Sequence, residues 1–478
     1  MRRYDLAVLG AGSAGLVAAI GAARLGARVV LVERERTGGD CLWTGCVPSK
    51  SLLATADLAH RMRAAGEVGL APAQPEIDLA RIMARIHQVQ ADIAVHDAPE
   101  RLRSEGVEVI HGEGRFEAPG RLLAGTRLVR YRRALVATGS RPVLPPVPGL
   151  EGMDPLTPAL TTDTVWELDA LPQRLAVLGG GATGCELAQA FARLGSAVTL
   201  VETSERLLSV EEPEVGTLIA QRLRAEGVEV CTGTSAEHLD GRTLTLTDGR
   251  RVPFDRILVA TGRVPRSEGL GLEAIGARTA EDGAIEVDAT LRTTARGVFA
   301  AGDVTGALPF THVAGHHAAI VVPNALFHAR RRFDPAAVPW VTFTAPEVAR
   351  VGLTEAQARA RHGTAVRVAR HDYAQVDRAV TAASTEGFAK LIVGRRGRLL
   401  GATVAAPAAG EAIAGLASVM ADGGRVGRIA SAVHPYPTFG EGPARAAQEH
   451  MSAVYLGERT RRLTRPLLAL LRGAERLR

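Results

Sequence analysis

The chain has 478 residues, of which 46% are apolar and 23% are charged. These proportions are typical of globular proteins and argue against disordered, collagen-like and membrane-spanning classes. Aromatic residues make up only 4%, which argues against nucleic-acid binding through base stacking, so we expect no nucleic-acid partner. The formal net charge of +6 favours anionic ligands such as phosphates.

An internal repeat is the first feature along the chain. Residues 6–33 align without gaps on residues 175–202, and 16 of the 28 positions are identical. Each copy predicts a buried strand, a glycine turn, a helix that ends at Arg-Leu-Gly, and a second buried strand that closes on a glutamate. The pattern therefore predicts two parallel βαβ units.

Glycines occupy equivalent places in the two copies and form the pattern G-x-G-x-x-G. They are Gly10, Gly12 and Gly15 in the first copy and Gly179, Gly181 and Gly184 in the second. The first glycine of each set allows a tight turn, the second lets a pyrophosphate approach the helix N-terminus, and the third permits close helix–strand packing. Glu33 and Glu202 close the second strands, where a carboxylate accepts hydrogen bonds from ribose hydroxyls. Two dinucleotide sites predict a flavin-dependent oxidoreductase that uses a nicotinamide; the alternative is that one site serves only as scaffold.

The segment after the first repeat contains two close cysteines, Cys41 and Cys46, and one of the two lysines of the chain, Lys50. Cysteines five residues apart point about 140° away from each other on an ideal helix. A disulfide between them therefore requires a distorted turn, which Gly45 permits. Because a helix N-terminus stabilises a thiolate, we interpret the pair as redox-active.

The second repeat also predicts which nicotinamide is used. Glu202 favours the free ribose hydroxyls of NADH, and Thr203 offers no positive charge for the 2′-phosphate of NADPH. Arg206 keeps NADPH as an alternative.

With these residues in hand, the sequence resembles the class I FAD-dependent pyridine-nucleotide disulfide oxidoreductases, which include dihydrolipoyl dehydrogenase, glutathione reductase and mercuric reductase. The resemblance covers nearly the whole chain. Its markers are GGDCLWTGCVPSK (38–50), ALVATGSRP (134–142), ILVATGRVP (257–265), GVFAAGDV (297–304), VTFTAPEVARVGLTE (341–355) and GFAKLIV (387–393).

The resemblance implies roles for several residues. Cys46 is expected to lie next to the flavin and Cys41 to exchange with the substrate. Lys50 is expected beside the flavin, paired with Glu186. Asp303 is expected to bind the FAD ribitol, and Gly139 and Gly262 of the two ATG motifs to line the cofactor sites.

The resemblance also implies an α/β fold with two Rossmann-like dinucleotide-binding domains and an α+β C-terminal dimerisation domain. The expected segments are an FAD domain (1–148), an NAD(P) domain (149–270), a central segment that completes the FAD domain (271–335), a dimer-interface domain (336–453) and a basic tail (454–478). We expect a cytoplasmic homodimer in which the catalytic base comes from the other subunit.

The sequence departs from lipoamide and glutathione reductases at Tyr436. Those enzymes carry histidine immediately before the Pro-Thr pair, with a glutamate five residues later, and here Glu441 retains the glutamate. Tyrosine titrates near pH 10 and is a poor base at neutral pH. His434 is an alternative base if the segment is extended, since residues i and i+2 then share a face. Mercuric reductases resemble this chain in having tyrosine here, but their C-terminal cysteine pair is missing, because no cysteine follows Cys231.

Other residues that suggest chemistry have simpler interpretations. Cys185 and Cys231 fall in segments predicted to be buried and are expected to be small core residues. We expect no metal site at His312, His316 and His317, because no carboxylate or thiolate accompanies them. The tail contains leucines beside arginines, with Pro466 as its expected first helical residue. We expect this tail to pack on the dimer or to be solvated, and do not expect it to bind a membrane.

Three functions remain open. The favoured one passes electrons from NAD(P)H through FAD to the Cys41–Cys46 disulfide and on to a small thiol-reactive or otherwise electrophilic acceptor, as in mercuric reductases. The second is a dihydrolipoyl dehydrogenase, against which the missing histidine counts. The third is a flavoprotein redox sensor tethered by its basic tail.

Overall fold

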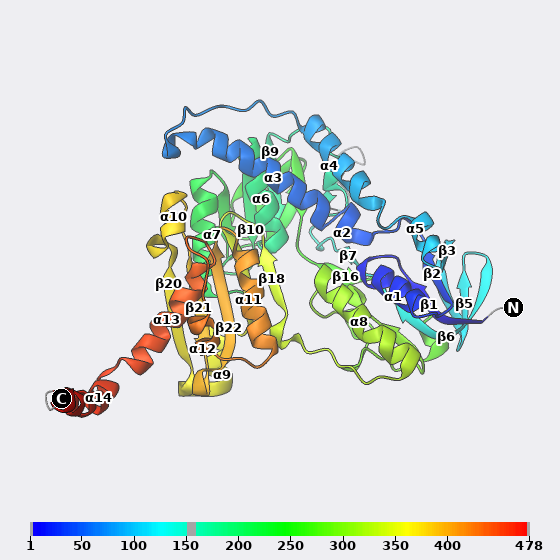
Figure 1. The fold of residues 1–478 in the computed structure, drawn as a ribbon. Coiled ribbons are helices and arrows are strands. Elements are labelled where there is room, and N and C mark those ends of the chain that lie inside the picture. The colour runs from blue at the N-terminus through cyan, green and yellow to red at the C-terminus, as the bar shows by residue number, and fades with distance from the viewer. Residues whose placement is uncertain (1–2, 151–158, 476–478) are drawn as a thin grey trace. The chain divides into compact units, whose positions relative to one another are not determined.

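The computed structural model describes residues 3–150 and 159–475 (Figure 1). The chain divides into two compact units. The larger takes Met1–Ala65, Ala71–Leu207 and Ala220–Asp334, and the smaller takes Gly66–Leu70, Leu208–Ile219 and Pro335–Arg478. The five segment boundaries expected from the sequence stay predictions.

The first repeat forms the centre of a seven-stranded sheet in the larger unit, with β17 beside β6 and the order β3-β2-β1-β6-β5-β4. Its parallel strands are β1 (Arg3–Leu9), β2 (Val29–Glu33), β3 (Val107–His111), β6 (Arg127–Val136) and β17 (Val298–Ala300). An antiparallel extension adds β4 (Gly114–Ala118) and β5 (Arg121–Ala124). Helices α1 (Ser13–Arg24) and α8 (Thr311–Phe327) pack together over one face of this sheet. The central strands read as apolar runs because both of their faces are buried.

The second repeat forms a five-stranded parallel sheet with the order β11-β10-β9-β15-β8. Its strands are β8 (Leu160–Thr161), β9 (Arg174–Leu178), β10 (Ala197–Glu202), β11 (Glu229–Thr232) and β15 (Arg256–Val259). Helix α6 (Ala182–Leu194) connects β9 to β10, as α1 connects β1 to β2. A small antiparallel sheet follows, formed by β12 (Ala236–Asp240), β13 (Thr243–Leu246) and β14 (Arg251–Pro253). Both predicted βαβ units are confirmed.

The remaining elements of the larger unit surround the cysteine segment. They are α2 (Gly39–Trp43), α3 (Cys46–Arg63), α4 (Leu79–Ala94), α5 (Pro99–Ser104) and the antiparallel pair β7 (Ser140–Pro142) and β16 (Arg263–Pro265). Helix α3 packs against α6 and α4. The cysteine segment is thereby joined to the helix of the second repeat.

The smaller unit is an antiparallel sheet with helices, ordered β18-β19-β22-β21-β20. The strands are β18 (Pro339–Thr342), β19 (Glu347–Gly352), β20 (Arg367–Asp372), β21 (Phe388–Val393) and β22 (Leu399–Ala406). The helices are α9 (Glu355–His362), α10 (Asp377–Thr381), α11 (Ala409–Ala421), α12 (Val426–Ser431) and α13 (Glu441–Tyr455). Two parallel nucleotide-binding sheets with an α+β C-terminal unit confirm the predicted fold class.

A buried lysine holds part of α7 (Pro213–Ala225) in the smaller unit. The Nζ of Lys390 lies 3.1 Å from Glu212, 2.8 Å from Glu214 and 2.9 Å from Glu355, and its side chain is only 3% exposed. Burial lowers the pKa of Lys390, but the carboxylates of Glu214 and Glu355 raise it more, so its pKa lies above its usual value. We interpret Lys390 as a structural residue, because removing it would leave the charges of these carboxylates uncompensated.

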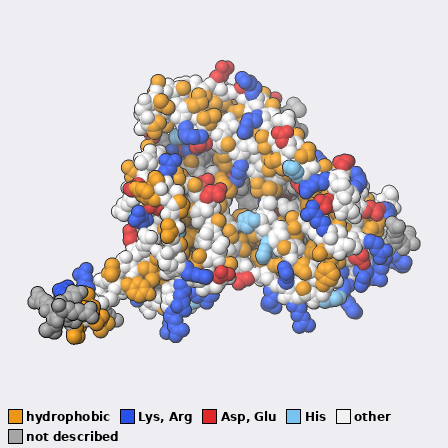
Figure 2. Space-filling view, in the orientation of Figure 1, with side chains coloured by type: hydrophobic (Ala, Val, Ile, Leu, Met, Phe, Trp, Pro, Cys, Tyr) orange, Lys and Arg blue, Asp and Glu red, His pale blue; other side chains and the backbone are white. Residues whose placement is uncertain are grey.

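The C-terminal helix α14 (Glu458–Glu475) begins eight residues before Pro466. The expectation that Pro466 starts the helix was therefore wrong; the proline lies inside the helix, where it removes one backbone hydrogen bond. Exposed leucines and arginines lie together at this end of the chain (Figure 2). Within residues 3–150 and 159–475, no helix has both the length and the hydropathy needed to cross a membrane.

Candidate functional site

The first and third glycines of each turn leave no room for a side chain. At Gly10, with φ of 97°, an added Cβ would lie 2.3 Å from the carbonyl oxygen of Ala137, and at Gly15 it would lie 1.9 Å from that of Gly10. The second turn repeats this geometry: a Cβ at Gly179 would lie 2.5 Å from a carbonyl oxygen, and one at Gly184 would lie 1.8 Å from another. These four glycines therefore hold each strand, turn and helix in close contact.

The middle glycine of each turn faces open space instead. A Cβ at Gly181 would meet no atom within 4 Å, and one at Gly12 would only touch Gly39 at 3.8 Å. Gly12 and Gly181 are the N-cap residues of α1 and α6, and neither helix has a side-chain cap. The uncapped N–H groups at these positions fit a pyrophosphate, because helix N-termini attract anions.

The two strand-end glutamates bind their own glycine turns. Glu33 accepts hydrogen bonds from the N–H groups of Ala11, at 2.7 Å, and Glu35, at 2.8 Å. Glu202 accepts from Gly180 at 2.6 Å and from Ser204 at 2.7 Å. Burial raises the pKa of Glu202, but these backbone hydrogen bonds lower it more, so its carboxylate stays ionised. Each turn therefore carries a fixed negative charge where a ribose is expected.

Residues expected around the flavin also lie together in the larger unit. Asp303 accepts a hydrogen bond of 2.7 Å from Ser140, and Lys50 Nζ lies 2.8 Å from Glu186, so the expected ion pair is present. Gly139 and Gly262 have φ of 71° and 139°, and a Cβ at either position would meet nothing within 4 Å. This combination of open glycine backbone and paired polar groups fits FAD and a nicotinamide dinucleotide.

In the sequence, His317 on α8 was considered only as part of a metal site, which we did not expect. Its Nδ1 accepts a hydrogen bond of 3.2 Å from the N–H of Gly302, next to Asp303, and its ring packs edge-on against Phe333 at 4.3 Å. Burial lowers the pKa of His317 to about 4, so the ring is neutral and can accept this bond. Its signal in the sequence was only a histidine in an apolar helix.

The two cysteines lie on either side of a break between helices. Cys41 is in α2, and Cys46 is the first residue of α3, after Gly45. The carbonyl oxygen of Asp40 accepts hydrogen bonds from the N–H groups of Thr44, at 2.9 Å, and Gly45, at 2.5 Å. The expected distortion at Gly45 is confirmed, and both cysteines are free thiols in the structure.

The environment of the two thiols differs. A hydrogen bond from Cys41, a hydrogen bond from Thr311 and the charge of Lys50 lower the pKa of Cys46 to about 6 against the effect of burial. The hydrogen bond to Cys46 and burial raise the pKa of Cys41. The Oγ1 of Thr311 lies 3.5 Å from Cys46 Sγ. The sequence did not reveal this contact, because Thr311 lies 265 positions after Cys46. At neutral pH the dithiol therefore holds a thiolate at Cys46 and a thiol at Cys41.

Cys185 and Cys231 are 0% and 1% exposed, so the expectation that they are core residues is confirmed. Burial raises the pKa of both thiols. Buried thiols with raised pKa values are inert.

Tyr436 and Glu441 belong to the smaller unit. The hydroxyl of Tyr436 donates to Asp377 at 2.7 Å, and Glu441 accepts from Arg445 at 3.1 Å. The peptide bond between Tyr436 and Pro437 is cis. His434 Nε2 donates to the carbonyl oxygen of Ile429 at 2.9 Å, so this histidine is bound to its own segment.

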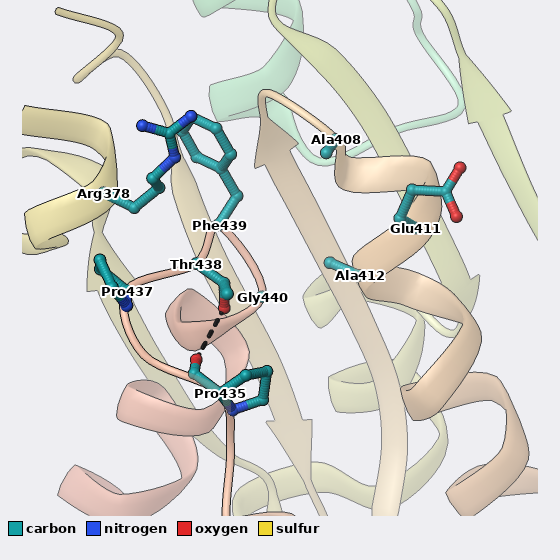
Figure 3. A pocket seen from close by; sticks show the side chains of 9 residues that line it. All are labelled: Arg378, Ala408, Glu411, Ala412, Pro435, Pro437, Thr438, Phe439 and Gly440. Atoms are coloured by element: carbon teal, nitrogen blue, oxygen red, sulfur yellow. Dashed lines mark hydrogen bonds between the residues drawn. The ribbon is translucent and has the colours of Figure 1, made fainter. Parts of the chain in front are cut away.

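A groove of about 420 Å³ lies between the Tyr436 loop and the start of α11 (Figure 3). It is lined by Arg378, Ala408, Glu411, Ala412, Pro435, Pro437, Thr438, Phe439 and Gly440. The loop is closed by a hydrogen bond of 3.0 Å from Thr438 Oγ1 to the carbonyl oxygen of Pro435. This loop, which carries Tyr436, thus forms one side of the groove.

Comparisons with known proteins agree with this geometry. The family described as pyridine nucleotide-disulphide oxidoreductase matches residues 4–318, and its dimerisation domain matches residues 338–447. The chain is 41% identical to a mercuric reductase of Streptomyces lividans, covering 94% of this chain and 97% of that one. It is 36% identical to a dihydrolipoyl dehydrogenase of Thermus scotoductus, covering 95% and 99%.

Among solved structures, the chain is similar to the Cu(II) complex of the HOCl-induced flavoprotein disulfide reductase RclA from Escherichia coli. The TM-score is 0.83 and the identity 29%, over 94% of this chain and 100% of that one. The chain therefore belongs to the class I pyridine nucleotide-disulphide oxidoreductases, FAD-dependent enzymes with NAD(P)H as electron donor.

Proposed function

We propose that this enzyme takes electrons from NADH and delivers them, through FAD and the Cys41–Cys46 pair, to a small thiol-reactive acceptor. The observation that carries the proposal is the placement of two free cysteines on either side of the break between α2 and α3. They lie in the same unit as the two dinucleotide turns. Bound FAD supplies the transfer of two electrons from a nicotinamide hydride to a disulfide.

The chain's own residues then handle charge and protons. Reduction of the disulfide breaks the sulfur–sulfur bond and adds two electrons. Cys46 holds one sulfur as a thiolate at the N-terminus of α3, near the charge of Lys50, and Cys41 takes up the proton that accompanies the two electrons and becomes a thiol. The thiol of Cys41 and the thiolate of Cys46 then pass two electrons to an oxidised acceptor. The Cys41 proton is released, and the Cys41–Cys46 disulfide forms again.

Glu202 supports NADH as the preferred donor. Its ionised carboxylate lies on the second glycine turn and would repel a 2′-phosphate. We expect a higher kcat/KM for NADH than for NADPH. A preference for NADPH would contradict this assignment and would indicate that Arg206 binds the phosphate.

The acid–base properties of Tyr436 indicate which class of acceptor the enzyme uses. Hydrogen bonding to Asp377 raises the pKa of Tyr436, so even less phenolate is present at neutral pH to act as a base than in an ordinary tyrosine. A site with tyrosine at this position therefore suits an acceptor whose reduction needs little base catalysis, such as the acceptor of a mercuric reductase, better than it suits a lipoyl group. The match to the dimerisation domain supports a homodimer, in which we propose that Tyr436 and Glu441 complete the site of the other subunit. The cytoplasmic location stays a prediction.

An acceptor screen tests the proposal. NADH oxidation is followed with lipoamide, glutathione disulfide, other low-molecular-weight disulfides, mercuric ion and quinones. We expect turnover with at least one thiol-reactive acceptor, and its loss in Cys46→Ser. Turnover that survives Cys46→Ser for every acceptor would contradict the proposed route through the thiols.

Two other functions give different results in this screen. A dihydrolipoyl dehydrogenase, favoured by the 36% identity to the Thermus enzyme, would show high activity with lipoamide. A tethered redox sensor is favoured by the exposed leucines Leu463, Leu467, Leu470 and Leu471 of α14. In that case the full chain would sediment with anionic liposomes and a chain without residues 458–478 would not.

A further inference from the structure

Asp40, the residue before Cys41, has two separate roles in the turn between the cysteines. Its backbone carbonyl closes the turn through Thr44 and Gly45. Its carboxylate pairs with Arg263 at 2.5 Å and lies 3.8 Å from Arg266. The turn that sets the cysteine geometry is therefore fixed from outside by an ion pair with a distant strand, β16.

Arg263 also binds Ser140, which contacts the Asp303 carboxylate. Its Nε donates to Ser140 Oγ at 2.8 Å, and Ser140 in turn donates to Asp303 at 2.7 Å. Its Nη2 donates to the carbonyl oxygen of Ser140 at 3.1 Å. One guanidinium thus connects the cysteine turn to the carboxylate expected to hold the FAD ribitol, which the planar five-donor fork of arginine allows.

The two arginines of this cluster face a second carboxylate. Asp163 pairs with the same two arginines, at 3.3 Å to Arg263 and 3.6 Å to Arg266, so two carboxylates face two guanidinium groups. The side chains of Asp40 and Asp163 are 35% and 25% exposed. Asp163 has the same partners and similar exposure, but it lies outside the cysteine turn.

The Asp40 carboxylate also lies near the expected binding site of an anion. Gly39 packs against Gly12, where a Cβ on Gly39 would lie only 2.6 Å from the Gly12 Cα. Asp40 is thus one residue away from the turn that fits a pyrophosphate. A carboxylate without a partner here would repel the phosphates and pull the turn towards solvent.

We infer that Asp40 and Arg263 are positioning residues, which hold the Cys41–Cys46 turn in register with the flavin site through the chain Asp40–Arg263–Ser140–Asp303. The inference rests on the proposed electron route through these cysteines. It adds that one arginine, Arg263, connects the Cys41–Cys46 turn to Asp303, the carboxylate expected to bind FAD.

The test compares Asp40→Asn with its matched control, Asp163→Asn, in FAD-loaded protein. Each loses one carboxylate that faces Arg263 and Arg266, but only the first loosens the cysteine turn. After two-electron reduction, we expect Asp40→Asn to lose most of the thiolate-to-flavin charge-transfer band and on the order of 10-fold of its disulfide-dependent kcat/KM, as expected for a misplaced reacting group. Asp163→Asn should keep the band, and both variants should keep their FAD. Asp40→Glu, which keeps the charge, should restore the band.

The outcomes separate this inference from the proposed function. Equal bands in wild type and Asp40→Asn, or equal losses in Asp40→Asn and Asp163→Asn, would overturn the inference alone. A wild type without any band would contradict the proposed route itself. If Asp40→Asn does not fold, Arg263→Lys replaces it: a lysine keeps the charge but cannot bind Asp40 and Ser140 together. Loss of the band in FAD-loaded Arg263→Lys supports the inference, and an unchanged band overturns it.

Discussion

Cys46 occupies the first position of α3, where its sulfur lies 3.5 Å from the Thr311 hydroxyl and is influenced by the Cys41 thiol. These contacts lower the pKa of Cys46 to about 6. We expect the charge-transfer band of the two-electron-reduced enzyme to persist at neutral pH and to fade as the pH falls through about 6, because the thiolate is then protonated. Absorbance of anaerobic reduced enzyme, titrated downward from neutral pH, measures this.

Two serine variants identify which thiol gives the band. Cys46→Ser should abolish it, whereas Cys41→Ser should show it without any reduction, because Cys46 then has no disulfide partner. If Cys41→Ser has no band, the assigned order of the two thiols is reversed.

Tyr436 predicts a gain of function. Asp377 raises the pKa of Tyr436 through a hydrogen bond, and Glu441 adds to the increase, so the tyrosine stays protonated at neutral pH. Tyr436→His would place an imidazole near these carboxylates, which keep it oriented and able to exchange protons. We expect lipoamide kcat/KM to rise on the order of 10²-fold, the low end for general acid–base catalysis.

The control for Tyr436→His is an artificial acceptor that takes electrons directly from FAD, with which the rate should hardly change. High lipoamide activity in the wild type that falls in the variant would mean that Tyr436 or His434 already acts as the base. The dihydrolipoyl dehydrogenase function would then replace the proposed one.

Helix α1 contains two glycines with opposite environments. A methyl group at Gly15 would collide with the carbonyl oxygen of Gly10, whereas one at Gly21 would meet no atom within 4 Å. Gly15→Ala should destabilise the protein by about 1–3 kcal/mol and reduce its FAD content. Gly21→Ala should stabilise it by about 0.5–1 kcal/mol, since alanine is the better helix former. Thermal unfolding with FAD quantitation checks both, and full FAD content in Gly15→Ala would contradict the assigned role of the turn.

The elements show which parts of the site a sequence can reveal. The two βαβ units were predictable because strand, turn and helix signals fall within 28 residues and occur twice. The break at Gly45 was predictable from helix geometry alone. The partners of Asp40 and Lys390 were not, because their ion pairs join residues 223 and 178 positions apart, and nothing local distinguishes those arginine and glutamate residues from their neighbours. The start of α14 was misjudged because the prediction relied only on the preference of proline for the first helical turn, whereas Pro466 lies inside the helix.

The whole molecule is expected to act as a dimer with shared sites. If Tyr436 completes the site of the other subunit, mixing Cys41→Ser and Tyr436→Ala chains should create one intact site in every mixed dimer. Random mixing makes half of the dimers mixed, so we expect about a quarter of wild-type activity with the acceptor found in the screen. The measurement compares refolded or co-expressed mixtures with each variant alone. Activity no higher than the average of the two variants would place both residues in the site of one subunit.

The two lysines have a practical consequence for labelling. Lys390 is 3% exposed and enclosed by three carboxylates, whereas Lys50 is 36% exposed and faces Glu186. Reagents that acylate amines should therefore modify Lys50 in preference to Lys390 in the folded protein. Because Lys50 belongs to the expected flavin site, the extent of acylation, read by mass spectrometry, would report how much of the enzyme carries its cofactor, without any assay of turnover.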